Sequence, residues 1–138
     1  MNVAVLSDIH GNHVAFESCL NYLKSREIDA FIFLGDYVGE FPRTEITMEL
    51  IYELQKKCQC YIIRGNKEEY QLWGLGGDKP EWNDYPSTVG MIRYAARHTR
   101  EKDLKYFERL PITLRVEFAD LPPLRICHGS PRNIKEDI

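Results

Sequence analysis

The chain carries four short runs of apolar residues, and each run ends in polar residues beside a glycine. The runs cover residues 2–10, 31–34, 60–64 and 124–127. Short apolar runs that stop at such a break are typical of buried strands. The second run is apolar throughout, which favours a central strand covered on both faces. The pattern therefore predicts a sheet of short strands.

Apolar residues at helical spacing fill the intervals between the first three runs. We expect helices over residues 12–26 and 44–57, the second opened by Pro42 and capped by Thr44. Strands that alternate with helices are joined by right-handed crossovers and lie parallel. The first half of the chain therefore predicts an α/β architecture with a parallel sheet.

The second half of the chain mixes helices, a loop and one more pair of strands. Alternation over residues 112–118 predicts a strand of an antiparallel pair or of a second sheet, and a turn is expected at residues 120–123. The other expected elements are a short helix and then a loop within residues 69–84, a helix over 87–97, and a helix capped by Thr99 and stopped by Pro111.

Residue types that bind metals stand at the ends of the apolar runs. They are Asp8 and His10 after the first run, Asp36 after the second, Asn66 after the third and His128 after the fourth. Open parallel sheets bind ligands at the carboxyl ends of their strands. Residues two apart in an extended segment share a face, so Asp8 and His10 can reach one point. Each position alone has a plain explanation as a turn or cap, but together they favour a divalent transition-metal site.

Composition and charge place the chain among ordinary globular proteins. Its 138 residues are 43% hydrophobic and 28% charged, which suits one domain with a hydrophobic core. The net charge of -3 gives no support for a nucleic-acid partner. No apolar stretch is long enough to span a bilayer, and no basic segment of a secretory signal is visible. We expect a cytoplasmic protein with no membrane partner.

The four cysteines fit the same expectation. Cys19, Cys58, Cys60 and Cys127 fall in predicted helices or strands, so we expect reduced core residues. Cys58 and Cys60 have the spacing of half a metal site, but no second pair of cysteines accompanies them. A structural role is therefore favoured for both.

The polar motifs, taken together, resemble the calcineurin-like metallophosphoesterase family. They are Asp8-x-His10, Gly35-Asp36, Gly65-Asn66 and His128-Gly129. Residues 35–39 and 128–131 are similar to the small bacterial and archaeal branch of that family. The resemblance covers essentially the whole chain, residues 1–138, as a single domain. It implies a four-layer α/β/β/α sandwich that is incomplete at its C-terminus.

The resemblance also implies a centre of two divalent metal ions. By motif position, Asp8 and His10 bind the first ion, Asp36 bridges both ions, and Asn66 and His128 bind the second. Asp36, Asn66 and His10 are then the expected catalytic residues. Mixed nitrogen and oxygen donors suit Mn²⁺, Fe²⁺, Zn²⁺ or Ni²⁺, and Mn²⁺ is the first expectation.

The implied activity is hydrolysis of phosphodiester or phosphomonoester bonds by a hydroxide between the two ions. The substrate is then a small phosphate ester, nucleotides included, and residues 74–84 are a candidate loop for substrate choice. The aromatic residues around this loop fit a pocket roof and a satellite hydrophobic cluster equally well; they are Tyr70, Trp73, Trp82 and Tyr85. The alternative is a non-catalytic scaffold, or an inactive fragment, of the same fold.

Two features depart from the family pattern. Lys67 stands where the family often has a histidine that contacts substrate; it either attracts phosphate or is a solvated helix residue, and the second interpretation is favoured. The family also closes its site with a Gly-His-x-His motif, which is absent through Ile138. The other histidines, His13 and His98, do not replace it. We therefore expect a fragment that exposes core surface and forms a homodimer or is marginally stable.

Overall fold

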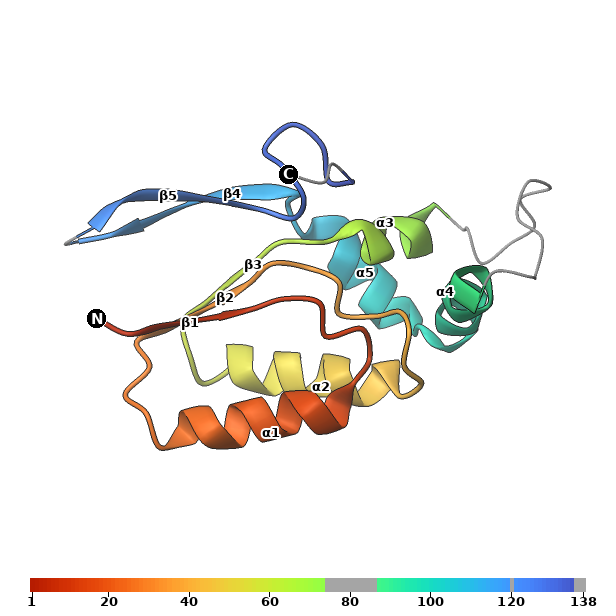
Figure 1. Ribbon diagram of the computed structural model, residues 1–138, viewed down its shortest axis with the longest axis horizontal. Helices are drawn as coiled ribbons and strands as arrows, with labels where there is room; N and C mark the ends of the chain where they lie inside the picture. The colour runs from red at the N-terminus through yellow and green to blue at the C-terminus, as the bar shows by residue number, and fades with distance from the viewer. Residues whose placement is uncertain (74–86, 120, 136–138) are drawn as a thin grey trace.

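A parallel sheet of three strands forms the middle layer of the structure (Figure 1). The strands are β1 (Val3–Leu6), β2 (Ala30–Phe33) and β3 (Cys60–Ile62), in the order β1-β2-β3. β2 is the central strand and is buried along its whole length, as its apolar sequence predicts. The computed structural model describes residues 1–73, 87–119 and 121–135.

The two faces of this sheet are covered differently (Figure 1). Helices α1 (His13–Lys24) and α2 (Thr44–Gln55) lie on one face, and each follows a strand in the chain. An antiparallel pair, β4 (Thr113–Phe118) and β5 (Leu121–Cys127), lies over the other face. These are the α/β/β layers of the predicted sandwich, and the described residues form no helical layer outside β4 and β5.

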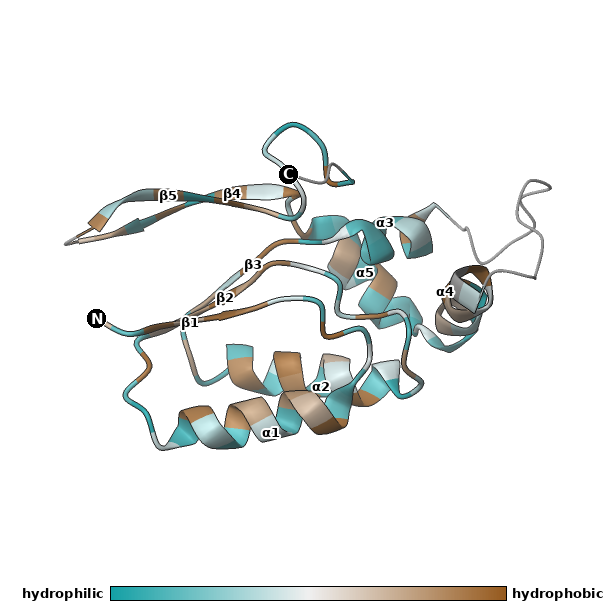
Figure 2. Cartoon of the chain, in the orientation of Figure 1, coloured by the Kyte–Doolittle hydropathy of each residue, from teal (hydrophilic) through white to brown (hydrophobic). Residues whose placement is uncertain are grey.

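β2 divides the hydrophobic core into two parts. Phe31 and Phe33 face the helices and belong to the larger cluster, while Ile32 packs with Val116 of β4 and Ile126 of β5. This division follows from the alternation of side chains along a strand. Figure 2 shows the apolar residues along the strands and on α1 and α2. Burial of each large apolar side chain contributes about 1.5–3 kcal/mol to folding.

Three further helices lie beyond the carboxyl ends of the parallel strands (Figure 1). They are α3 (Asn66–Leu72), α4 (Ser87–His98) and α5 (Glu101–Arg109). Arg64, just after β3, donates hydrogen bonds to the carbonyl oxygens of Phe107 and Leu110, at 3.2 and 3.1 Å. These bonds tie the C-terminal end of α5 to the edge of the sheet where the strands end.

Two predicted helix caps are wrong. Thr44 is the first residue of α2, and the residue before it, Arg43, caps the helix from a left-handed conformation without a side-chain bond. Thr99 donates its hydroxyl back to a carbonyl of α4, and the residue that caps α5 is instead Arg100, whose N–H donates to Asp103 at 3.3 Å. In both places a neighbouring residue takes the capping position.

The turn predicted at residues 120–123 is also wrong. β5 begins at Leu121, so Pro122 and Pro123 lie within a strand. Proline is tolerated there because β5 pairs only with β4 in the described part of the chain, which leaves one edge free of ladder hydrogen bonds.

The cysteines are free, as predicted, and Cys58 and Cys60 pack against the larger core cluster, but Cys19 is not a core residue. Cys19 is exposed on α1, and Cys58, Cys60 and Cys127 are only partly buried. Partial burial raises the pKa of Cys60 to about 11, so its thiol is protonated at neutral pH. Among the described residues, no helix has the length and apolar character needed to cross a membrane.

Candidate metal centre

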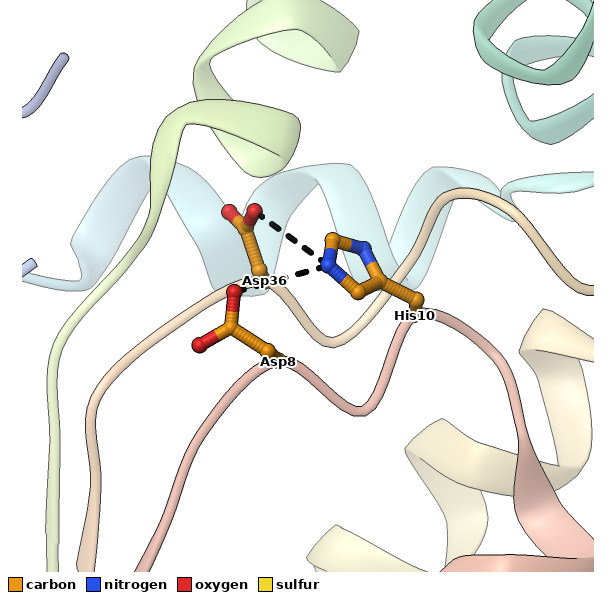
Figure 3. A group of neighbouring side chains, drawn as sticks. All are labelled: Asp8, His10 and Asp36. Atoms are coloured by element: carbon orange, nitrogen blue, oxygen red, sulfur yellow. Dashed lines mark ion pairs between the residues drawn. The ribbon is translucent and has the colours of Figure 1, made fainter. Parts of the chain in front are cut away.

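Asp8, His10 and Asp36 bring three possible ligand atoms within 4.8 Å of one another (Figure 3). Nε2 of His10 lies 3.5 Å from Oδ1 of Asp8 and 3.8 Å from Oδ2 of Asp36. Asp8 and His10 follow β1 and Asp36 follows β2, so two neighbouring strands deliver the three side chains. Two carboxylates and an imidazole are a suitable donor set for a divalent transition metal.

The backbone of all three residues is left-handed. The φ angles of Asp8, His10 and Asp36 are 56°, 52° and 57°, and Arg43 is the only other non-glycine residue with a positive φ in the described part of the chain. Such conformations are unfavourable for residues with a Cβ and gather at functional sites. Asp8 and His10 do converge, but the extended geometry predicted for them is wrong, because β1 ends at Leu6.

The loops after β1 and β2 stay hydrogen-bonded beyond the sheet. The N–H of Asp8 donates to the carbonyl of Gly35 at 3.1 Å, and the N–H of His10 donates to the carbonyl of Asp36 at 2.9 Å. The hydroxyl of Ser7 donates to Oδ2 of Asp8. These bonds fix the two loops against each other, so the ligand atoms are held in place by the sheet itself.

A fully buried glutamate, Glu68 of α3, holds the loop that carries Asp36. Its carboxylate accepts the N–H groups of Asp36, Tyr37, Val38 and Gly65, at 2.8, 2.8, 3.2 and 2.8 Å. The sequence prediction did not single out this residue. Its signal is a glutamate three residues after Gly65, the residue that caps the helix, which is the spacing of a capping box.

The environment of Asp36 strongly disfavours a lone negative charge. The pKa of Asp36 is raised from 3.8 to about 8, chiefly by burial and also by the charges of Glu68 and Asp8. The N–H of Lys67, which donates to Oδ1 at 2.9 Å, opposes the shift. Burial also raises the pKa of Glu68. A cation beside a carboxylate favours the ionised form. A buried carboxylate of this kind therefore fits a metal ligand.

His128 meets the other oxygen of Asp36. It directly follows β5, and its Nε2 lies 3.5 Å from Oδ1 of Asp36. Its Nδ1 lies 2.8 Å from the carbonyl oxygen of Leu34. Because a carbonyl only accepts, Nδ1 carries the proton and donates it there. This tautomer leaves a lone pair on Nε2, directed to the same place as the carboxylate.

Asn66, the first residue of α3, lies between His128 and Asp36. With the amide oriented to satisfy hydrogen bonding, its nitrogen donates to Nε2 of His128 at 2.9 Å and to Oδ2 of Asp36 at 3.1 Å. The opposite orientation presents the carbonyl oxygen at the same place, as metal ligation requires. The structure thus brings both Asn66 and His128 to the carboxylate of Asp36.

Lys67 is not a solvated helix residue, so that interpretation is wrong. Its side chain is 11% exposed, and Nζ lies 2.8 Å from Oε1 of Glu40. The helix places the lysine toward the loop after β2, where a carboxylate takes up its charge. Glu40 is a second residue near the centre that the sequence prediction did not single out.

The two other histidines lie outside the group of ligand atoms. His13 is the first residue of α1. His98 is the last residue of α4, and its ring stacks on Tyr94 with 4.0 Å between the ring centroids. That neither residue replaces a Gly-His-x-His motif stays a prediction.

The aromatic residues after α3 are only partly described. Tyr70 and Trp73 contact edge to face, with ring centroids 6.4 Å apart, and Lys135 lies over both rings, 4.4 and 4.6 Å from their centroids. Trp82, Tyr85 and the candidate substrate loop at residues 74–84 lie outside the described residues. The choice between a pocket roof and a satellite cluster stays open.

Comparisons with known proteins agree with this geometry. The family model for calcineurin-like phosphoesterases matches residues 1–136. The chain is 32% identical over 114 residues to an uncharacterized protein of Methanocaldococcus jannaschii. The aligned region covers 81% of this chain and 43% of that protein.

Two crystal structures are similar over nearly the whole chain. One is a hypothetical protein of Pyrococcus horikoshii OT3, with a TM-score of 0.78 and 27% identity over 99% of this chain and 58% of that one. The other is a metallophosphoesterase from Sphaerobacter thermophilus, with a TM-score of 0.70 and 29% identity over 100% of this chain and 51% of that one. The chain thus spans about half the length of these relatives.

Proposed function

Because the chain belongs to the calcineurin-like phosphoesterase family, we propose that residues 1–138 form one metallophosphoesterase domain that binds two divalent ions and hydrolyses phosphate esters. The observation that carries the proposal is the position of Asp36. One of its carboxylate oxygens faces Nε2 of His10 and the other faces Nε2 of His128, at 3.8 and 3.5 Å. A carboxylate between two imidazoles suits a bridge between two cations.

The proposed ligands are the five residues around this carboxylate. Asp8 and His10 hold the first ion, Asp36 contacts both, and Asn66 and His128 hold the second. These donors are carboxylate, imidazole and amide groups, which suit Mn²⁺ first and also Fe²⁺, Zn²⁺ or Ni²⁺. When bound, such ions supply Lewis-acid stabilisation of phosphoryl oxygens and a hydroxide nucleophile near neutral pH.

The protein contributes position and a suitable electrostatic environment. The buried carboxylate of Asp36 is held by the turn that Glu68 supports, so its two oxygens keep fixed directions. The imidazole of His10 lies beside both aspartates, where we propose that it orients the reacting groups as well as binding metal. The amide of Asn66, beside His128 and Asp36, adds a neutral group. Fixed donors of this kind reduce reorganisation during the reaction.

We propose a phosphodiester or phosphomonoester of small size, nucleotides included, as the substrate. The four free cysteines support a cytoplasmic location, because disulfides form mainly in oxidising compartments. The expected homodimer stays a prediction, and sedimentation of the purified chain tests it.

The test compares two aspartates at opposite ends of β2. Asp36→Asn removes the bridging charge, whereas Asp29→Asn changes an exposed aspartate before the strand. We expect two Mn²⁺ per chain and Mn²⁺-dependent hydrolysis of bis(4-nitrophenyl) phosphate or 4-nitrophenyl phosphate in the wild type and in Asp29→Asn. The Asp36→Asn variant should lose activity and bound metal.

The outcomes separate the alternatives. A wild-type chain that binds no Mn²⁺ contradicts the metal centre, and full activity in Asp36→Asn contradicts the role of that residue. Two bound ions without hydrolysis of either ester favour the non-catalytic scaffold over the enzyme.

A further inference from the structure

Glu40 contacts two side chains next to the centre, an imidazole and an ammonium group. Its Oε2 contacts Nδ1 of His10, and its Oε1 lies 2.8 Å from Nζ of Lys67. The side chains of His10, Glu40 and Lys67 are 19%, 29% and 11% exposed, so the three groups are largely shielded from water. Figure 3 shows Nε2 of His10 facing the two aspartates, whereas the nitrogen that contacts Glu40 is Nδ1.

We propose that Glu40 is a positioning residue for His10, and that Lys67 in turn positions Glu40. The proposal rests on the proposed role of His10 as a metal ligand. The carboxylate accepts the proton of Nδ1, which fixes the tautomer and the ring orientation and leaves the lone pair of Nε2 directed at Asp8 and Asp36. Carboxylates that hold the second nitrogen of a ligating histidine also increase its basicity.

The local backbone is arranged to allow this contact. Gly39, the residue before Glu40, has a φ of +146°. A Cβ at this position would lie 2.8 Å from Nδ1 of His10 and 3.6 Å from Cγ of Lys67. The glycine therefore leaves the space in which the imidazole and the lysine stem come together around Glu40.

The contact with Lys67 restricts the side chain of Glu40 to one position. A glutamate on a loop has several rotamers, and a second, opposite charge restricts it to the one that meets both partners. The lysine also balances the negative charge that Glu40 adds beside two aspartates. This assignment replaces the idea that Lys67 is free to attract phosphate, because its amine already contacts a carboxylate.

The other histidine of the centre supports the same principle. Nδ1 of His128 donates to the carbonyl oxygen of Leu34 at 2.8 Å, so its Nε2 is also free to bind metal. Nδ1 of each imidazole thus faces an oxygen atom, while its Nε2 faces Asp36. Glu40 does for His10 what a backbone carbonyl does for His128.

The experiment measures Mn²⁺ affinity by calorimetry or electron paramagnetic resonance, without reference to turnover. Glu40→Ala should weaken binding of the first ion about 10–100-fold. Glu40→Gln should lose less, because its amide oxygen still accepts the Nδ1 proton. Lys67→Met should weaken binding by roughly 2–5-fold, as expected for loss of one supporting ion pair. Glu53→Ala, which removes an exposed glutamate of α2, is the matched control and should bind like the wild type.

A double-mutant cycle separates positioning from a general loss of structure. If Glu40 acts through His10, Glu40→Ala should have no further effect on Mn²⁺ affinity in a His10→Ala background. An equal loss in both backgrounds overturns the proposal, and so does wild-type affinity in Glu40→Ala, even with a lower melting temperature. A wild type that binds no Mn²⁺ overturns the metal centre itself, whereas metal binding without hydrolysis overturns only the proposed catalysis.

Discussion

The two histidines of the centre are supported by different parts of the molecule. Nδ1 of His128 meets a backbone carbonyl at the end of β2, while Nδ1 of His10 meets the side chain of Glu40. The first support is present whenever the central strand forms. The second depends on two particular side chains, Glu40 and Lys67. The half of the centre that contains His10 is therefore the half that substitutions can adjust without disturbing the sheet.

Asp36 belongs to both halves of the centre. Substitutions can therefore be ordered by whether they affect both halves, one half or neither. A change that displaces Asp36 should damage both halves together. A change beside His10 should damage one half and leave the contact between His128 and Leu34 intact. A change at a histidine outside the centre should damage neither.

The largest effect is expected for Glu68→Ala, which removes the acceptor of four backbone N–H groups, one of them from Asp36. Buried donors left without a partner should destabilise the protein by about 3–5 kcal/mol. Urea denaturation measures the loss, and Mn²⁺ binding should weaken at both sites. Glu17→Ala, an exposed glutamate of α1, should melt like the wild type. A stable Glu68→Ala variant would show that water replaces the carboxylate.

The next effect is a dependence of stability on pH in the metal-free protein. The pKa of Asp36 is about 8 in the folded state and near 3.8 when unfolded. Between these values the folded state keeps a proton that the unfolded state has lost, so stability falls as pH rises. Melting temperatures in a chelator should therefore decrease from pH 5 to pH 9.

Two comparisons assign this slope to Asp36. The Asp36→Asn variant should show a flatter profile, because the titrating group is gone. Saturating Mn²⁺ should also flatten the profile of the wild type, since the ion favours the charged carboxylate. A metal-free wild type whose stability rises across this range would contradict the assignment.

A smaller effect, confined to one half, is expected for Gly39→Ala. The new Cβ meets Nδ1 of His10 at 2.8 Å, in a backbone conformation that favours glycine. We expect a loss of about 1–2 kcal/mol of stability and weaker binding of the first ion only. Gly90→Ala is the matched control: nothing lies within 4 Å of its Cβ, and alanine in α4 should stabilise the protein by about 0.5–1 kcal/mol. Equal Mn²⁺ affinities in the two variants would remove the steric explanation.

The smallest effect is expected for His98→Ala. The ring stacks on Tyr94 at the end of α4 and lies outside the group of ligand atoms. Mn²⁺ stoichiometry and affinity should match those of the wild type. Loss of an ion in this variant would mean that the centre has a ligand outside the proposed five.

The parallel sheet was predictable because each strand is an apolar run that stops at a glycine. β2, with Phe31, Ile32 and Phe33 in sequence, is buried on both faces, as that run predicts. The polar residues at the strand ends were predictable for the same reason, since the topology of a parallel sheet brings these ends together. The apolar runs and the polar residues that follow them were sufficient for these predictions.

The supports of the centre were not predictable in the same way. Glu40 and Glu68 act through contacts with residues about 30 positions away, and no periodicity records such contacts. The left-handed conformations of Asp8 and His10 were missed because an apolar run gives no sign of where its extended backbone stops. A charged residue beside a glycine in the loop after β2 was the available signal, at Gly39-Glu40.

The pairing of His128 with Leu34 also has a consequence for the order of folding. The two residues are 94 positions apart, whereas Asp8, His10 and Asp36 come from consecutive strands of one sheet. Local units form before contacts that close long loops. We expect the His10 half to assemble with the parallel sheet and the His128 half to join when β4 and β5 dock. Docking of His128 is then a late folding step, and the rate at which the second metal ion binds during refolding measures when it occurs.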